Sequence, residues 1–191
     1  MHKATVGNVE VTALRDAHLV MDPRQFLPAH AEAFVAEYGH LADVRGLLPM
    51  AVTCYLVRSA GKNILVDTGL GPRKRPGFPG GNLDAAFRDA GLSPADIDVV
   101  VHTHLHIDHV GWNTFDREDG SRELFFPKAR FFIQQVEWDY WMTPERIAHP
   151  ANAHLAECVE PLRDSGRITF VDGEQAIDEN LTCVATPGHT P

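Results

Sequence analysis

Short apolar runs separated by turn residues make up most of the pattern along the chain. Alternating apolar residues on either side of Gly7-Asn8 predict a tight hairpin. Further apolar or β-branched runs predict strands at 51–58, 64–66, 98–101, 130–133, 168–171 and 181–185. Helical spacing of apolar residues predicts helices at 31–38, 82–90, 135–141 and 151–164. Hairpins mixed with strand–helix units are typical of an α/β sandwich with a mixed sheet.

A segment rich in proline and glycine, residues 72–81, interrupts this pattern. Its three prolines and three glycines predict a mobile loop. It follows the turn at Asp67 and precedes a predicted helix, a position that suits a flap over a site. Its basic stretch, residues 72–76, is interpreted as solvated, with a role in binding an anionic substrate as the alternative.

A cluster of side chains that can bind metal lies directly after the predicted strand 98–101. Residues 102–109 contain four histidines and an aspartate, at a strand end where open α/β folds place their sites. Imidazole and carboxylate together suit zinc above all, with manganese, cobalt or iron as alternatives. An extended backbone would point His104 and His106 to the same side, while Asp108 and His109 would reach a different position. The segment therefore predicts a metal site that offers ligands to two neighbouring ions.

Three motifs carry a resemblance to a known family. The pattern His-x-His-x-Asp-His at 104–109 resembles the signature of the metallo-β-lactamase superfamily. Residues 63–69, which end in Asp-Thr-Gly, resemble that family's strand–turn element, and residues 185–190 resemble the element that delivers a further metal-binding histidine. Together the motifs span most of the chain from about residue 50 onward. The resemblance implies a metallo-β-lactamase-like αββα sandwich with mixed sheets.

The resemblance also implies the ligand set. It assigns His104, His106 and His189 to a first metal and Asp108 and His109 to a second. Three histidines complete the protein ligands of a tetrahedral catalytic zinc whose fourth position holds water, whereas two ligands alone make a poor site. The expected cofactor is therefore Zn2+, as one or two ions, with Mn2+, Co2+ or Fe2+ as alternatives.

Several nearby residues are candidates for other roles. The resemblance makes Asp67 a residue that orients the site, with a simple turn aspartate as the alternative. His102 shares the register of the other histidines, but the family motif does not use it. Trp112 either lines the substrate pocket, together with Phe78, or packs in the core. His154 lies in no motif and is interpreted as a surface residue.

The end of the chain departs from the family pattern. Family members continue to a metal-bridging aspartate and a last histidine for the second metal, and neither has a counterpart before Pro191. We therefore expect residues 1–191 to be a single metallo-hydrolase domain that is incomplete at its C-terminus, with its second half truncated. One face of the sheet should then be apolar and uncovered, which would cause poor solubility or pairing into a homodimer.

The ligands predict a metal-dependent hydrolase. Three imidazoles lower the pKa of a metal-bound water toward neutrality, and Asp108 is the catalytic residue expected to orient the hydroxide or accept a proton. The stretch from Gln135 to His189 is most similar to the branch of acyl-homoserine lactonases and organophosphate hydrolases, which implies an ester, lactone or phosphotriester substrate. The alternatives are glyoxalase II-like thioester hydrolysis, iron-dependent oxygen chemistry, and a catalytically inactive metal-binding fragment or interaction module.

Charge and composition narrow the expected partners to a small-molecule substrate. A formal net charge of -9 argues against a nucleic-acid groove, which needs clustered Lys and Arg. No apolar run approaches the length of a membrane span, and no apolar stretch typical of a secretory signal follows the first five residues. The three cysteines are far apart and odd in number, which predicts reduced thiols in a cytoplasmic protein.

Overall fold

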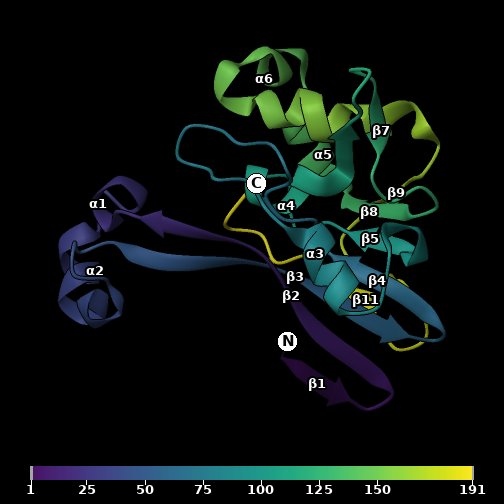
Figure 1. Cartoon of the computed structure of the whole chain (residues 1–191), viewed down its shortest axis with the longest axis horizontal. Helices are drawn as coiled ribbons and strands as arrows, with labels where there is room; N and C mark the ends of the chain where they lie inside the picture. The colour runs from purple at the N-terminus through teal and green to yellow at the C-terminus, as the bar shows by residue number, and fades with distance from the viewer. Residues whose placement is uncertain (1, 191) are drawn as a thin grey trace.

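A seven-stranded mixed sheet forms the centre of the molecule in the computed structural model, which describes residues 2–190 (Figure 1). The strands lie in the order β1-β2-β3-β4-β5-β8-β9. β1 to β4 pair antiparallel, and β4, β5, β8 and β9 pair parallel. The bounds of these strands are β1 (Lys3–Val6), β2 (Val9–Met21), β3 (Leu48–Ser59), β4 (Lys62–Val66), β5 (Val99–Val101), β8 (Arg130–Gln134) and β9 (Ile168–Val171). The α/β class with a mixed sheet is confirmed.

Six short α-helices and two small strand pairs complete the regular structure of the described residues. The helices are α1 (Pro23–Phe26), α2 (Ala31–Tyr38), α3 (Leu83–Asp89), α4 (Ile107–Val110), α5 (Gln135–Trp141) and α6 (Pro144–Ala148). The strand pairs are β6 (Thr114–Asp116) with β7 (Arg122–Leu124), and β10 (Gln175–Ala176) with β11 (Thr182–Cys183). Single 3-10 turns occupy Gly39–Leu41, Pro94–Asp96, Gly111–Asn113 and Pro150–Asn152. No helix among residues 2–190 has the length and apolar character that a membrane crossing requires.

Two predicted elements differ from the structure. The helix predicted at 151–164 is a π-helical turn, Leu155–Val159, followed by a 3-10 stretch, Glu160–Ser165. Pro161 has no backbone N–H to donate, so a regular α-helix cannot run through this point. The strand predicted at 181–185 is shortened to β11, which pairs with β10 and stays outside the large sheet.

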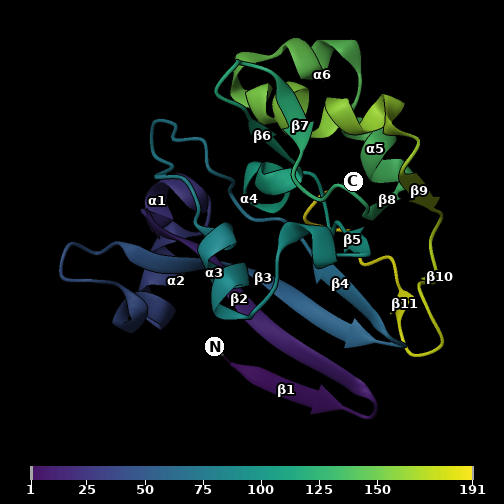
Figure 2. The same ribbon diagram turned by 45° about the vertical axis from the view of Figure 1, so that its right-hand side comes forward.

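The two faces of the sheet are covered by other elements to different extents. Side chains alternate along each strand, so Phe131 of β8 points to one face and Phe132 to the other. The first face packs against α3, α5 and the turns at 150–165 to form the main core. Among the described residues, the second face packs against the C-terminal segment, residues 172–190, which passes β4 and returns toward α5 (Figure 2). A mainly apolar hollow of about 580 Å³ separates this segment from the sheet. The second face is thus apolar, as predicted, but it is thinly covered and not bare.

The N-terminal half of the sheet extends into a long arm. β2 and β3 continue beyond the other strands as a two-stranded ribbon with α1 and α2 at its far end (Figure 1). The ribbon has an irregularity between Arg15 and Ala17, where the buried Asp16 accepts hydrogen bonds from the backbone N–H groups of Leu70 (2.6 Å) and Leu83 (2.9 Å). Asp16 therefore fastens both ends of the loop that contains residues 72–81.

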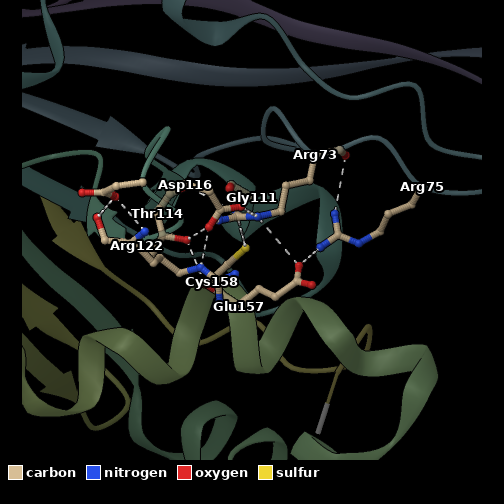
Figure 3. Close-up of polar contacts among 10 residues, drawn as sticks. Arg73, Arg75, Gly111, Thr114, Asp116, Arg122, Glu157 and Cys158 are labelled. Atoms are coloured by element: carbon tan, nitrogen blue, oxygen red, sulfur yellow. Dashed lines mark hydrogen bonds and ion pairs between the residues drawn. The ribbon is translucent and has the colours of Figure 1, made fainter.

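Two arginines of that loop have acidic partners that its composition did not predict. Arg73 pairs with Asp116 at 2.8 Å and Arg75 pairs with Glu157, and only 14% and 19% of the two arginine side chains are exposed (Figure 3). The interpretation of residues 72–76 as a solvated stretch fits the exposed Pro72, Lys74 and Pro76. It does not fit Arg73 and Arg75, because acidic partners distant in the sequence neutralise both guanidinium groups. These ion pairs and the Asp16 hydrogen bonds hold the loop against the body.

Candidate metal centre

The histidine-rich segment begins where β5 ends at Val101. Residues 102–106 continue without regular structure and enter α4 at Ile107, so the extended strand assumed for the two-residue spacing is absent. The rings of His104 and His106 converge nevertheless, with centroids 4.7 Å apart. His189, on the C-terminal segment, approaches both rings, with centroids 4.7 Å from that of His104 and 4.9 Å from that of His106.

The three histidines form a group with the geometry of a metal site. One ring nitrogen from each of His104, His106 and His189 lies within 4.8 Å of the others, and Nδ1 of His106 is 3.1 Å from Nε2 of His189. Donor atoms of a tetrahedral zinc with Zn–N bonds of about 2.0–2.1 Å lie about 3.3 Å apart. Nδ1 of His104 contacts Thr103 Oγ1 at 3.0 Å, while its Nε2 is buried and has no hydrogen-bond partner among the described residues. These residues therefore fit a divalent ion.

The electrostatics of the group favour neutral imidazoles. Burial lowers the pKa of His104 to about 3, and the neighbouring His109 and His106 act in the same direction. The pKa of His106 is also lowered, first by burial and then by His189. Only a neutral imidazole offers a lone pair to a metal, so both rings are in a ligating state at neutral pH.

Asp67 lies directly behind this group. Its carboxylate accepts hydrogen bonds from the N–H and the hydroxyl of Thr103, both at 2.8 Å, and lies 2.8 Å from Nδ1 of His109. Burial would raise the pKa of Asp67, but the imidazoles of His102, 3.8 Å away, and of His109, at hydrogen-bond distance, hold it well below its ordinary value. Its backbone has a φ of 58°, in the left-handed region that aspartate enters more readily than most residues. This placement supports the orienting role over a simple turn role.

Asp108 and His109 stand beside the three-histidine group. Nε2 of His109 is 3.5 Å from a carboxylate oxygen of Asp108, and its ring centroid is 3.8 Å from that of His104. Burial lowers the pKa of His109, but the carboxylates of Asp108 and Asp67 raise it more, to about 9. His109 thus lies between the carboxylates of Asp67 and Asp108. The assignment of Asp108 and His109 to a second metal stays a prediction.

The remaining predicted site residues have defined positions. Trp112 is 6% exposed and donates from Nε1 to Asp16 at 2.7 Å, which favours the core-packing alternative. Phe78 and Ile107 both pack against a small cluster centred on Leu70, so Phe78 lies near the metal-binding segment. His102 is 4% exposed, stacks on Phe131 and is outside the ligand group. The substrate roles of Trp112 and Phe78 stay predictions.

Sequence reasoning missed two residues that hold the ligand segment. The backbone N–H of Leu105 donates to Oε1 of Glu137 at 2.8 Å, and its carbonyl accepts from Nε2 of His154 at 3.1 Å. Glu137 is 3% exposed and His154 is 5% exposed, so the interpretation of His154 as a surface residue is wrong. Only Glu137 carried a signal of burial in the sequence, because it lies one helical turn before Trp141, on the aromatic side of α5. His154 carried none.

Comparisons with known proteins agree with this geometry. Residues 47–115 match the model of the metallo-β-lactamase superfamily. An N-acyl homoserine lactonase from a Bacillus species is 25% identical over 163 residues, which are 76% of this chain and 57% of that protein. A probable metal-dependent hydrolase from Staphylococcus aureus superposes with a TM-score of 0.78 at 20% identity, over 98% of this chain and 67% of that one. The dizinc quorum-quenching lactonase AidC gives a TM-score of 0.68 at 24% identity, over 92% of this chain and 62% of that one.

The chain therefore matches the metallo-β-lactamase superfamily model over residues 47–115, in agreement with the resemblance of the Asp-Thr-Gly element and the histidine motif. It spans just over half of the length of the Bacillus lactonase. The matched model covers the Asp-Thr-Gly element and the whole histidine motif, the parts of the chain that position His104 and His106.

Proposed function

We propose that this protein is a metal-dependent hydrolase of neutral esters, with N-acyl homoserine lactones as the leading substrate class. The observation that carries the proposal is the convergence of His104, His106 and His189, one ring nitrogen of each within 4.8 Å of the others. Three neutral imidazoles are the ligand set of a catalytic zinc with an open fourth position. The lactonase relatives support the substrate class.

The charges near the site favour a neutral substrate. Arg73 and Arg75 are the basic residues that an anionic substrate would need, and Asp116 and Glu157 neutralise them. A lactone, an ester or a phosphotriester carries no charge at its reacting centre. These ion pairs therefore argue against the anionic-substrate alternative.

Asp108 is the residue proposed to handle protons. A zinc ion in this site would supply an acidic water and an electrophile for the substrate carbonyl. Burial raises the pKa of Asp108, but the neighbouring His109 imidazole lowers it by more, so the carboxylate is ionised at neutral pH. It accepts a proton as the water oxygen bonds to the carbonyl carbon, and returns one to the alkoxide as the ring C–O bond breaks.

Replacing one ligand tests the proposal. His106→Ala removes one of three donors, so the zinc content measured by elemental analysis should fall from about one ion per chain to near zero. Turnover of an N-acyl homoserine lactone should fall with it, and chelation of the wild-type protein should abolish turnover until zinc is restored. His30→Ala, at an exposed histidine before α2 in the arm, is the matched control. Unchanged zinc content in His106→Ala would overturn the ligand assignment.

The substrate class has its own test. A panel of an N-acyl homoserine lactone, a nitrophenyl ester, a phosphotriester and a thioester compares the branches of the family under one set of conditions. We expect the lactone to give the highest kcat/KM. A higher value for the thioester would favour the glyoxalase II-like alternative, and no turnover by zinc-loaded protein would favour the inactive metal-binding fragment.

A further inference from the structure

The peptide unit between two proposed ligands is held at both of its polar atoms. Leu105 lies between His104 and His106, and its side chain is fully buried. Its N–H donates to Glu137 of α5 and its carbonyl accepts from His154, at 2.8 and 3.1 Å. A carbonyl can only accept, so His154 carries its proton on Nε2 in this contact. Both partners are almost wholly buried, which removes water as a competitor for either bond.

The segment that contains His154 contacts the other end of the ligand motif as well. Cys158 lies four residues after His154, and its thiol is 3.7 Å from the carbonyl of Gly111, just beyond α4. The Thr114 hydroxyl donates to the Glu157 carbonyl at 2.8 Å (Figure 3). Residues four apart share one side of a helical turn, so the π-helical segment can contact both ends of the ligand motif.

The same segment is itself fixed to the body of the protein. The Glu157 carboxylate pairs with Arg75, and the Arg73 guanidinium contacts the Cys158 sulfur at 3.4 Å (Figure 3). Arg73 is also held by Asp116 at 2.8 Å. These contacts restrain the backbone from which His154 projects, in addition to the contacts of this segment with the ligand loop.

We propose that His154 and Glu137 are positioning residues that clamp the Leu105 peptide and thereby aim His104 and His106 at one ion. This inference rests on the proposed metal site. Neither residue touches an expected ligand atom, so each acts through the backbone. Losing one partner leaves a buried backbone group unsatisfied, which favours rotation of the peptide away from its observed orientation. Groups that orient metal ligands typically change affinity 10- to 100-fold when removed, and about the same loss is expected here.

Three substitutions at position 154 test the clamp. Glutamine places its amide nitrogen near the position of Nε2, asparagine is one bond too short to reach the Leu105 carbonyl, and leucine removes the donor. We measure zinc affinity by competition with a chromophoric chelator, and the absorption spectrum of the cobalt-loaded protein. His154→Asn and His154→Leu should bind zinc about 10- to 100-fold more weakly and show an altered cobalt spectrum, while His154→Gln should stay near wild type.

A matched pair at position 137 gives an independent reading. Glu137→Gln keeps an oxygen that accepts from the Leu105 N–H, and Glu137→Leu removes it. The clamp predicts a loss of zinc affinity in the leucine variant and rescue by glutamine. If a leucine variant fails to fold by circular dichroism, the His154→Asn and His154→Gln pair decides the question, because both side chains are neutral amides.

The outcomes separate the clamp from the proposed function. If wild-type protein binds no zinc, the metal site itself is wrong. If wild type binds zinc and all folded variants bind it equally, with one cobalt spectrum, the clamp is wrong and the proposed function stands. If glutamine and asparagine at position 154 lose affinity equally, reach to Leu105 is not the cause, and the positioning role is overturned.

Discussion

The two faces of the seven-stranded sheet support the metal site in different ways. His104 and His106 belong to a segment braced on the helix-covered face, where Leu105 is clamped and the main core lies. His189 belongs to the segment over the thinly covered face, beside the apolar hollow. The three-histidine group thus joins the tightly packed ligand segment on the helix-covered face to the more loosely attached C-terminal segment. Two ligands are pre-positioned by the core, and the third depends on how the C-terminal segment rests on the sheet.

The largest expected effect distinguishes the two faces through neighbouring residues of β8. Phe131→Ala should destabilise the protein by about 3–5 kcal/mol, because a fully buried ring leaves a cavity in the main core. Phe132→Ala should cost less, about 1–2 kcal/mol, because a hollow already lies beside that ring. Urea unfolding measures both values. The pair is matched in residue type and strand, so equal losses would show that the two faces are packed equally well.

A second test measures how the stability of the protein depends on pH through His154, which is buried on the helix-covered face. Burial lowers the pKa of His154 to about 4, below the value of about 6.5 in an unfolded chain. As the pH falls from 6.5 to 4, the unfolded chain binds a proton that the folded protein excludes, so stability decreases by up to about 3 kcal/mol. Above pH 6.5 the imidazole is neutral in both states and the effect vanishes.

The variant His154→Gln isolates the contribution of His154 to the pH dependence of stability. Glutamine does not titrate, so the stability of the variant should decline less between pH 7 and pH 4.5 than that of wild type. Chemical denaturation at several pH values measures the difference. Parallel declines in the two proteins would mean that His154 is not buried as a neutral base.

The smallest expected effect is a difference in the reaction rates of the three cysteine thiols, which report on access to the two faces. Cys54 and Cys158 are buried in the main core, while Cys183 lies half-buried on β11. Burial raises the pKa of all three thiols, so access decides which one reacts. Cys183 alone should react with a thiol reagent in the folded protein, and zinc should slow the reaction several-fold by holding His189. Reaction of all three at one rate would contradict the comparison.

Local patterns predicted the elements that depend on neighbouring residues. The Gly7-Asn8 turn joins β1 to β2 as expected, and α2 spans the predicted residues Ala31–Tyr38. The ligands at 104–106 are recognisable because the whole motif is contiguous. In each case the determining information lies within a few residues of the element.

Features that depend on distant segments were not predictable in the same way. Glu137 and His154 contact Leu105 across 32 and 49 residues of sequence, and Arg75 contacts Glu157 across 82. A single histidine outside any motif carries no signal of burial, and a basic loop carries no signal of its acidic partners. The length of β11 likewise depends on whether a strand lies beside it in the large sheet, which local propensity does not specify.

The separation of 83 positions between His106 and His189 has a consequence for the order of events as the chain is made. His104 and His106 leave the ribosome together, so a two-ligand capture of an ion can occur while the segment that contains His189 is still being synthesised. The third ligand arrives only after a long loop has closed, and closing long loops is a late, non-local event. Tight ion binding should therefore coincide with the final docking of the C-terminal segment. In the mature protein, the lifting of that segment is the expected route by which the ion exchanges with solvent.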